Sequence, residues 1–376
     1  MERRKQKRNN QIECDTERPL KQHKEDLEIC WFNEIPIELA SLILQFACHN
    51  SVGSTWTDEV IIEGYAKSSS ERDQVINHIV CRFVCKQWKA FLPPPNSAQC
   101  RSFAPFVAEK GWLNLLKWAR GRGCGLAHRI CEQAALGGHW EVLKWLKEHN
   151  CSWNHFTCAS AAEGGHLRVL KWLRLNGCSW EQYTCNMAAE KGHFAILKWA
   201  RENGCDWAES TCAAAAWGGH LEILKWLRAN GCPWDKEVCI MAAENGHFEV
   251  LKWAIENGCY CDTKPSEAAA ANGNLEMLKW LKRHGGQWND VDCFISAALH
   301  GRLEVLKWLR EIGCSWDEGG EWVCVAAAEG GQLEALKWLR ENGCPWTFET
   351  WKYARLSENK EVIKWVKLNG CPRPQE

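Results

Sequence analysis

The 376-residue sequence has no run of about 18 apolar residues such as a membrane helix needs, and its first residues lack the apolar core of a secretion signal. It also has no excess of charge of either sign, because the formal net charge is −1. It contains no phosphate-binding loop, nucleophile elbow or pair of catalytic carboxylates. These absences predict a soluble intracellular protein, cytoplasmic or nuclear, that does not enter a membrane, does not bind nucleic acid and is not an enzyme.

The chain repeats one pattern ten times between residue 101 and residue 376. A Lys-Trp pair marks the same position in each copy, at steps of 27 residues apart from one step of 28 and one of 30. The lysines of these pairs are Lys117, Lys144, Lys171, Lys198, Lys225, Lys252, Lys279, Lys307, Lys337 and Lys364. A fixed period of this size is typical of a solenoid, in which each copy packs on its neighbours.

Each copy predicts two short helices, as the copy around Lys225 illustrates. Residues 211–217 predict an alanine-rich first helix, and residues 220–230 predict a second helix with one apolar face. Gly219 separates the two helices, and Gly231 stands where a helix ends in a left-handed conformation. The sequence therefore predicts an all-α helical-repeat solenoid, and we expect it to be a monomer.

The cysteines follow the same period, since 17 of the 23 lie in the repeats. One row follows the helix-ending residue: Cys124, Cys151, Cys178, Cys205, Cys232, Cys259, Cys314, Cys344 and Cys371. A second row lies in the first helices: Cys131, Cys158, Cys185, Cys212 and Cys239. An odd number of cysteines in a long chain without a secretion signal favours packed, reduced thiols over a disulfide framework.

A zinc site is the alternative interpretation of this pattern. Cys151, Cys158 and His166 recur in successive copies, but their spacing is not that of a zinc knuckle and no fourth ligand recurs. The histidine directly follows a glycine at the start of a second helix, where its ring can hydrogen-bond backbone groups. We therefore expect no metal and no cofactor, although a metal-responsive or thiol-responsive protein stays an open alternative.

The first hundred residues differ from the array. Residues 1–29 are polar and rich in basic residues, which predicts a disordered tail, with a nuclear-import or nucleic-acid-binding cluster as the alternative interpretation. Residues 30–95 contain two helical stretches separated by a polar interval, and Pro93-Pro94-Pro95 ends the second stretch. These stretches carry too few apolar residues for a core of their own, so we expect them to need a partner chain or the first repeat.

The repeats resemble ankyrin repeats. The stretch Ala242-Ala243-Glu244-Asn245-Gly246-His247-Phe248-Glu249-Val250-Leu251-Lys252 is similar to the second half of that motif. The period of 27 is shorter than the 33 residues of the family, and the Thr-Pro-Leu-His opening is absent. The resemblance implies an ankyrin-like stack with short loops, packed by the tryptophans of its turns. This variety of short repeat, rich in Trp and Cys, is similar to the arrays encoded by large DNA viruses of amoebae and by some protists and algae. A viral origin would imply that the protein acts inside the host cell.

Residues 30–95 resemble an F-box with an insertion. The opening carries Ile35, Pro36, Leu39, Ile43 and Leu44, and the closing segment carries Val84 and Trp88. The resemblance implies that these seven residues dock onto a Skp-type adaptor of a cullin ubiquitin ligase. The repeats would then choose the target for ubiquitylation.

Variation between copies indicates where a target would bind. Buried rows of the repeat agree from copy to copy, whereas two rows of the first helix vary and include Met187, Trp217, Met241 and Glu244. We expect these four residues to contact the target protein, because exposed large apolar side chains favour an interaction surface. Neutral drift of an unused surface is the alternative interpretation, and a plain scaffold without a ligase link is the alternative function.

The last copy is expected to cap the array. Lys360 stands in a row that is otherwise apolar, Arg355 stands in a row of alanines, and Glu358 replaces the glycine between the helices. Burying these charges under a further repeat would cost several kcal/mol. We therefore expect one side of this repeat to face water.

Overall fold

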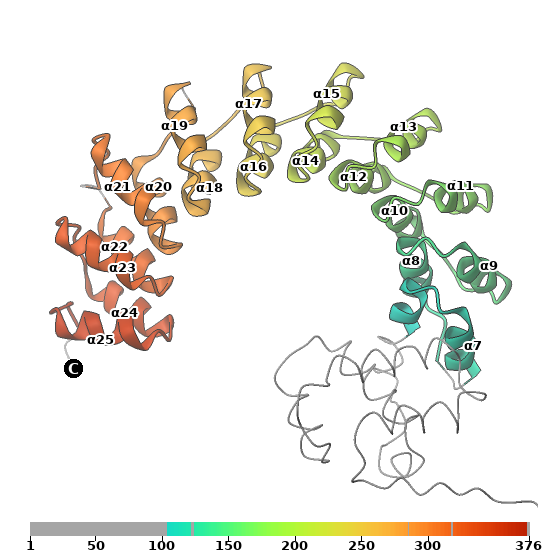
Figure 1. The fold of residues 1–376 in the computed structure, drawn as a ribbon, viewed down its shortest axis with the longest axis horizontal. Coiled ribbons are helices and arrows are strands. Elements are labelled where there is room, and N and C mark those ends of the chain that lie inside the picture. Colours follow the sequence, from blue (N-terminus) through green and yellow to red (C-terminus); the bar gives the residue numbers. More distant parts are fainter. Residues whose placement is uncertain (1–103, 122–123, 285, 317–318, 374–376) are drawn as a thin grey trace, which may run out of the picture. The chain divides into compact units, whose positions relative to one another are not determined.

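The structure is a computed structural model that describes residues 104–121, 124–284, 286–316 and 319–373 (Figure 1). These residues form helices and turns and contain no β-strand, as predicted for an all-α repeat protein. The expected tail at residues 1–29 and the F-box-like module at residues 30–95 lie outside the described residues, and so do all seven expected adaptor contacts. The chain divides into two compact units, Met1–Ser152 and Trp153–Glu376.

The described part of the first unit holds the first two repeats. Residues 104–109 are helical and precede α7 (Leu113–Gly121). The next repeat consists of α8 (His128–Leu136) and α9 (Trp140–Glu148).

The second unit continues the alternation of first and second helices. Its first helices are α10 (His155–Glu163), α12 (Gln182–Glu190), α14 (Glu209–Trp217), α16 (Glu237–Glu244), α18 (Lys264–Asn272), α20 (Asp290–Leu299), α22 (Glu321–Glu329) and α24 (Phe348–Leu356). Its second helices are α11 (Leu167–Leu175), α13 (Phe194–Glu202), α15 (Leu221–Ala229), α17 (Phe248–Glu256), α19 (Leu275–Arg283), α21 (Leu303–Glu311), α23 (Leu333–Glu341) and α25 (Lys360–Leu368).

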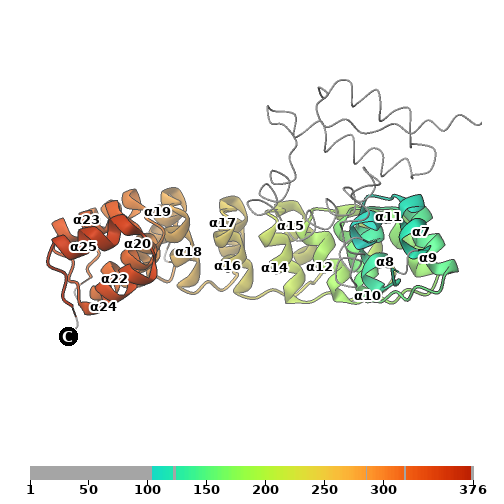
Figure 2. The same cartoon turned by 90° about the horizontal axis from the view of Figure 1, so that it is seen from below.

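Packing between helices stabilises this unit, because isolated helices of nine residues are marginal in water. In α15 the side chains of Ile223, Leu224 and Leu227 are buried, and each buried aliphatic side chain contributes roughly 1.5–3 kcal/mol. In α14 the fully buried side chains include Ala215 and Ala216, which are small enough for neighbouring first helices to approach closely. Figure 2 shows α14, α16 and α18 in one row and α15, α17 and α19 in another. Contacts between neighbouring repeats come mainly from the first helices.

The two predicted glycine positions have the expected backbone conformation. Gly219 has φ +74° between the helices, and Gly231 has φ +79° after the second helix. The second position is occupied once by Asn150, with φ +57°, and asparagine tolerates this region better than most residues. The predicted turns are therefore confirmed in the copies that the structure describes.

The helix bounds differ slightly from the prediction. The first helix α14 begins two residues earlier than expected, at Glu209. The Oγ1 atom of Thr211 accepts a hydrogen bond from the backbone N–H of Ala208 at 3.3 Å, and this bond organises the extra turn. The second helix α15 starts at Leu221, one residue later than predicted, and His220 is its N-cap residue.

The last described repeat departs from this pattern at the positions that the sequence singled out. Arg355 and Lys360 are exposed, whereas the alanines in the Arg355 row are fully buried in earlier copies. Glu358 has φ +57° in place of a glycine. Positive φ is unfavourable for residues with a side chain, so this turn is more strained than the equivalent turns in other copies.

Candidate functional site

The first helices of the second unit present one uncovered face, which we call the first-helix face. It consists of the second, sixth and ninth residues of α10, α12 and α14 and the equivalent residues of α16. Steps of four and three residues bring these positions onto one side of a helix. The residues are Phe156, Ser160, Glu163, Tyr183, Met187, Glu190, Ser210, Ala214, Trp217, Glu237, Met241 and Glu244, and none of them is buried.

All four predicted target-binding residues lie on this face. Trp217 is 45% exposed and Glu244 is exposed, whereas Met187 and Met241 are half-buried. The structure therefore places them together on three neighbouring helices, α12, α14 and α16. The exposed indole of Trp217 is the most unusual of the four, because an aromatic ring of this size normally buries most of its surface.

The sequence analysis missed two aromatic residues of the first-helix face. Phe156 and Tyr183 are 44% and 42% exposed, and their ring centroids are 5.8 Å apart in an edge-to-face arrangement. The ring of His155 lies beside that of Phe156, with centroids 4.1 Å apart and ring planes inclined by 43°. Phe156 and Tyr183 occupy the same position of successive copies. A comparison of the copies at this position, as was made for the row of Trp217, could have identified them.

The first-helix face is acidic as well as apolar. It carries Glu163, Glu190, Glu237 and Glu244 and no lysine or arginine at its twelve positions. Lys191, next to this face, lies 2.8 Å from Glu190 and 4.0 Å from Glu163. The hydrogen bond with Glu190 raises the pKa of Lys191, so this ammonium stays charged and offsets one of the glutamates.

The recurring histidines make structural contacts. The Nε2 atoms of His193, His220 and His247 each lie 2.9–3.0 Å from a backbone carbonyl oxygen 30 residues earlier in the chain, in the preceding repeat. The ring of His220 also fills the space beside Gly192, where a Cβ atom would lie 2.6 Å from it. These contacts confirm the expected packing role. Among the described residues there is no group of three or more His, Cys, Asp or Glu side chains that could hold a metal ion.

The tryptophans of the turns also pack between repeats, as expected. Trp207 lies against Trp226 with ring centroids 5.7 Å apart, and the guanidinium of Arg201 lies 4.3 Å from the Trp207 ring. The same arrangement joins Trp180 to Trp199 and to Arg174. The second-helix tryptophans of this unit are half-buried.

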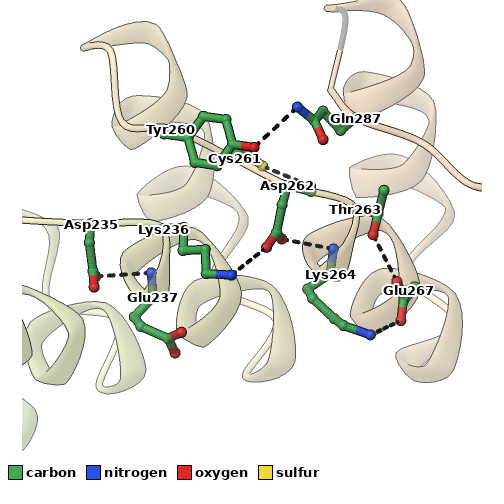
Figure 3. A network of polar contacts seen from close by, with 10 residues as sticks. All are labelled: Asp235, Lys236, Glu237, Tyr260, Cys261, Asp262, Thr263, Lys264, Glu267 and Gln287. Atoms are coloured by element: carbon green, nitrogen blue, oxygen red, sulfur yellow. Dashed lines mark hydrogen bonds and ion pairs between the residues drawn. The ribbon is translucent and has the colours of Figure 1, made fainter.

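A polar network replaces these aromatic contacts between α16 and α18 (Figure 3). Lys236 Nζ lies 3.0 Å from Asp262 Oδ2, and Gln287 donates a 3.3 Å hydrogen bond to the hydroxyl of Tyr260. Burial alone would raise the pKa of the Asp262 carboxyl, but hydrogen bonds from Lys236 and from the Lys264 backbone outweigh it and hold this pKa below its usual value. The network contains no group arranged as a catalytic acid or base, so we interpret it as a structural link.

Comparisons with known proteins assign the repeat. A model of ankyrin repeats in three copies matches residues 211–292, and a model of ankyrin repeats in many copies matches residues 185–228. A search of curated proteins gave no match. Among solved structures, the ankyrin repeat domain of human ASB11 is similar at 21% identity, covering 43% of this chain and 85% of its own, with a TM-score of 0.37. That likeness is too limited to add to the assignment. None of the described helices is long and apolar enough to cross a membrane. The helical array is therefore an ankyrin-like repeat solenoid, and its residues 185–292 match models of ankyrin repeats.

Proposed function

We propose that this protein is a non-catalytic adaptor whose first-helix face captures a target protein. Ankyrin repeats are typically interaction scaffolds without catalytic activity. The observation that carries the proposal is the exposure of Phe156, Tyr183 and Trp217 on three neighbouring first helices. Exposed aromatic side chains in such a row favour a binding surface, because aromatic anchors dominate the energy of protein interfaces.

The chemistry of the face specifies the kind of target. Phe156, Tyr183 and Trp217 offer apolar and cation-binding ring surfaces, while Glu163 and Glu244 supply negative charge beside them. A segment with both apolar and basic side chains would satisfy both features, and its lysines or arginines would gain ion pairs and cation–π contacts. The proposed target is therefore a protein with an exposed basic and apolar segment.

The apolar area of this face can be tested without changing its charge. The Trp217→Ala and Met241→Ala substitutions should together reduce capture of the target at least tenfold, because they remove two apolar contacts. The matched control is Leu175→Ala, which makes the same kind of change at an 87% exposed leucine on the second helix α11. Capture is measured from cell lysate with the full chain and quantified by mass spectrometry. Equal loss in both variants would contradict the proposed face.

The link to a ubiquitin ligase is a second part of the proposal. It rests on the F-box-like residues Ile35, Pro36, Leu39, Ile43, Leu44, Val84 and Trp88, which lie outside the described residues. In this proposal they dock onto a Skp-type adaptor of a cullin ligase, and the target held by the array is ubiquitylated. A scaffold or blocking protein with no ligase link is the alternative function.

A binding experiment separates these two functions. The full chain should capture a purified Skp-type adaptor, and the Leu39→Glu and Trp88→Ala substitutions should together abolish that capture without changing the far-ultraviolet circular dichroism. Failure of the unmodified chain to bind the adaptor would leave the scaffold function. Because the target-binding residues lie elsewhere in the sequence, target capture should be unchanged in this variant.

A further inference from the structure

Six repeats place a first-helix cysteine in contact with a cysteine of the turn twenty residues later, and in one of them Cys261 also contacts the first-helix Cys239. The pairs are Cys131–Cys151, Cys158–Cys178, Cys185–Cys205, Cys212–Cys232, Cys239–Cys259 and Cys324–Cys344. All twelve side chains are buried. Each contact lies within one repeat, so the pairs form six separate sites.

The geometry of one pair shows how the two thiols are held. Cys131 Sγ donates to Cys151 Sγ at a distance of 3.2 Å, and Cys151 Sγ lies 3.5 Å from the carbonyl oxygen of Ala127. In the second unit, Cys178 Sγ donates to the carbonyl oxygen of Asn154 at 3.2 Å. The thiol of the turn thus contacts both the first-helix thiol and the carbonyl of the residue before that helix.

The same contact recurs along the second unit. The turn thiols of Cys205, Cys232, Cys259 and Cys344 each donate to a carbonyl oxygen 24 residues earlier, at 3.1–3.4 Å. Five turn thiols of this unit are therefore held in one orientation. The carbonyl contact therefore fixes where each of these turn thiols lies relative to its first helix.

The environment acts in opposite directions on the pKa values of the two thiols of a pair. The hydrogen bond with Cys178 and burial raise the pKa of Cys158 far above its usual value. The same hydrogen bond lowers the pKa of Cys178. The turn thiol is therefore the more readily ionised of the two, and a thiolate is the form that reacts with peroxides.

We propose that these six pairs are sites of reversible disulfide formation within single repeats. Hydrogen peroxide is the oxidant: the turn thiolate attacks one peroxide oxygen and becomes a sulfenic acid, and one water leaves. The first-helix thiol then displaces the sulfenic hydroxyl as a second water, so two S–H bonds are replaced by one S–S bond. A disulfide is about 2.0 Å long, so the sulfurs of Cys131 and Cys151 must approach by about 1 Å.

Each disulfide would tie a turn covalently to its own first helix. A closed loop of this length reduces the freedom of the unfolded chain, which stabilises the folded repeat. Oxidation should therefore raise the midpoint of thermal unfolding by about 5 °C or more, and a thiol reductant should reverse the change.

The chain provides its own controls. Ser266 stands at the first-helix cysteine position and Gly286 at the turn position, so that repeat has no pair. Cys371 is a turn cysteine whose first-helix position is Trp351, and its Sγ lies 3.6 Å from the carbonyl oxygen of Thr347. Burial raises the pKa of Cys371 to about 11. Cys371 resembles the paired turn thiols but lacks a cysteine at the partner position.

The experiment treats the full reduced chain with hydrogen peroxide below its unfolding temperature. Remaining thiols are then alkylated in denaturant, and peptides are mapped without reduction. The expected result is six cross-linked peptide pairs, each joining cysteines twenty residues apart, with Cys371 alkylated. The Cys212→Ser variant should lose one cross-link and keep five, whereas Cys371→Ser should keep all six.

Two results would overturn the proposal. One is a map in which all twelve paired cysteines are alkylated after the treatment. The other is a map dominated by links between different repeats or by sulfinic and sulfonic acids, because these would show that the native contacts do not direct the reaction.

Discussion

Two regions of the second unit link their turns with different kinds of side chain. Around α14 and α15, an arginine and a tryptophan link each turn to its neighbours, as Arg228 does to Trp234 at 4.3 Å. Between α16 and α19 the equivalent positions hold Ile255 and Cys261, so both members of the pair are replaced together. The second-helix Trp280 stacks instead on His284, with centroids 4.4 Å apart.

In the region between α16 and α19, hydrogen bonds and an ion pair replace the arginine–tryptophan contact. Lys236 and Asp262 join two successive turns, and Ser266 donates to the carbonyl oxygen of Gln287 at 3.1 Å. The histidine contact is also replaced, since Asn272 Nδ2 donates to the carbonyl oxygen of Glu244 at 2.7 Å. The left-handed glycines and the buried aliphatic residues of the second helices are kept in both regions. The fold thus depends on the backbone turns and the aliphatic core, and the side-chain links between repeats can be exchanged.

The largest effect is expected from removing the repeat formed by α24 and α25, in which charged residues replace the apolar residues of the earlier copies. Deleting residues 348–376 should expose the side of α22 and α23 that α24 and α25 cover, and we expect aggregation in size-exclusion chromatography. The substitutions Lys360→Leu and Arg355→Ala in the full chain should cause self-association of the same kind, because they make an exposed side apolar. Monomeric behaviour of both variants would show that this repeat is not a cap.

Converting a regular turn into the other type tests the comparison directly. The Arg228→Ile and Trp234→Cys substitutions together should lower the free energy of unfolding by about 2–4 kcal/mol, because the indole contacts are lost and no polar network replaces them. The reverse pair, Ile255→Arg with Cys261→Trp, should change it less, since the network already links those turns. Chemical denaturation measures both, and equal effects would contradict the distinction.

The histidine contact should contribute less. His220→Ala removes the hydrogen bond to the Glu190 carbonyl and should cost about 1–2 kcal/mol. His220→Asn should cost about half as much, because Asn359, at the same position of a later copy, donates to a different carbonyl of the preceding copy, that of Gly331, at 2.9 Å. Denaturation curves of the two variants supply the comparison, and an asparagine variant no more stable than the alanine variant would show that ring packing dominates.

The smallest effect is expected at the ion pair of the polar network. Lys236 is 48% exposed, so Asp262→Asn should cost less than about 1 kcal/mol. Because the pKa of Asp262 is lowered in the folded protein, this contribution is present above about pH 4 and is lost as the pH falls through the folded-state pKa. Unfolding of the two proteins should therefore differ at pH 7 and converge in acid. A difference in the free energy of unfolding that stays the same at every pH would show that packing, rather than the ion pair, causes the effect.

Much of the fold could be predicted from the sequence, because the period, the apolar face of the second helix and the glycine positions repeat many times. The four residues Met187, Trp217, Met241 and Glu244 could be placed on one face for the same reason. The contacts of His220 and Arg201 with neighbouring repeats required the structure, since sequence spacing does not give distances between side chains. The polar network around Asp262 was also missed, because it occurs once and leaves no periodic signal.

The central claim is that the first-helix face, rather than the second helices, captures the target. The most direct measurement compares quantitative capture by the unmodified chain, the Trp217→Ala and Met241→Ala double variant, and the Leu175→Ala variant. We predict that proteins with basic and apolar segments are lost from the double variant and retained by the control. Retention of the same proteins by all three chains, with circular dichroism unchanged, would contradict the claim.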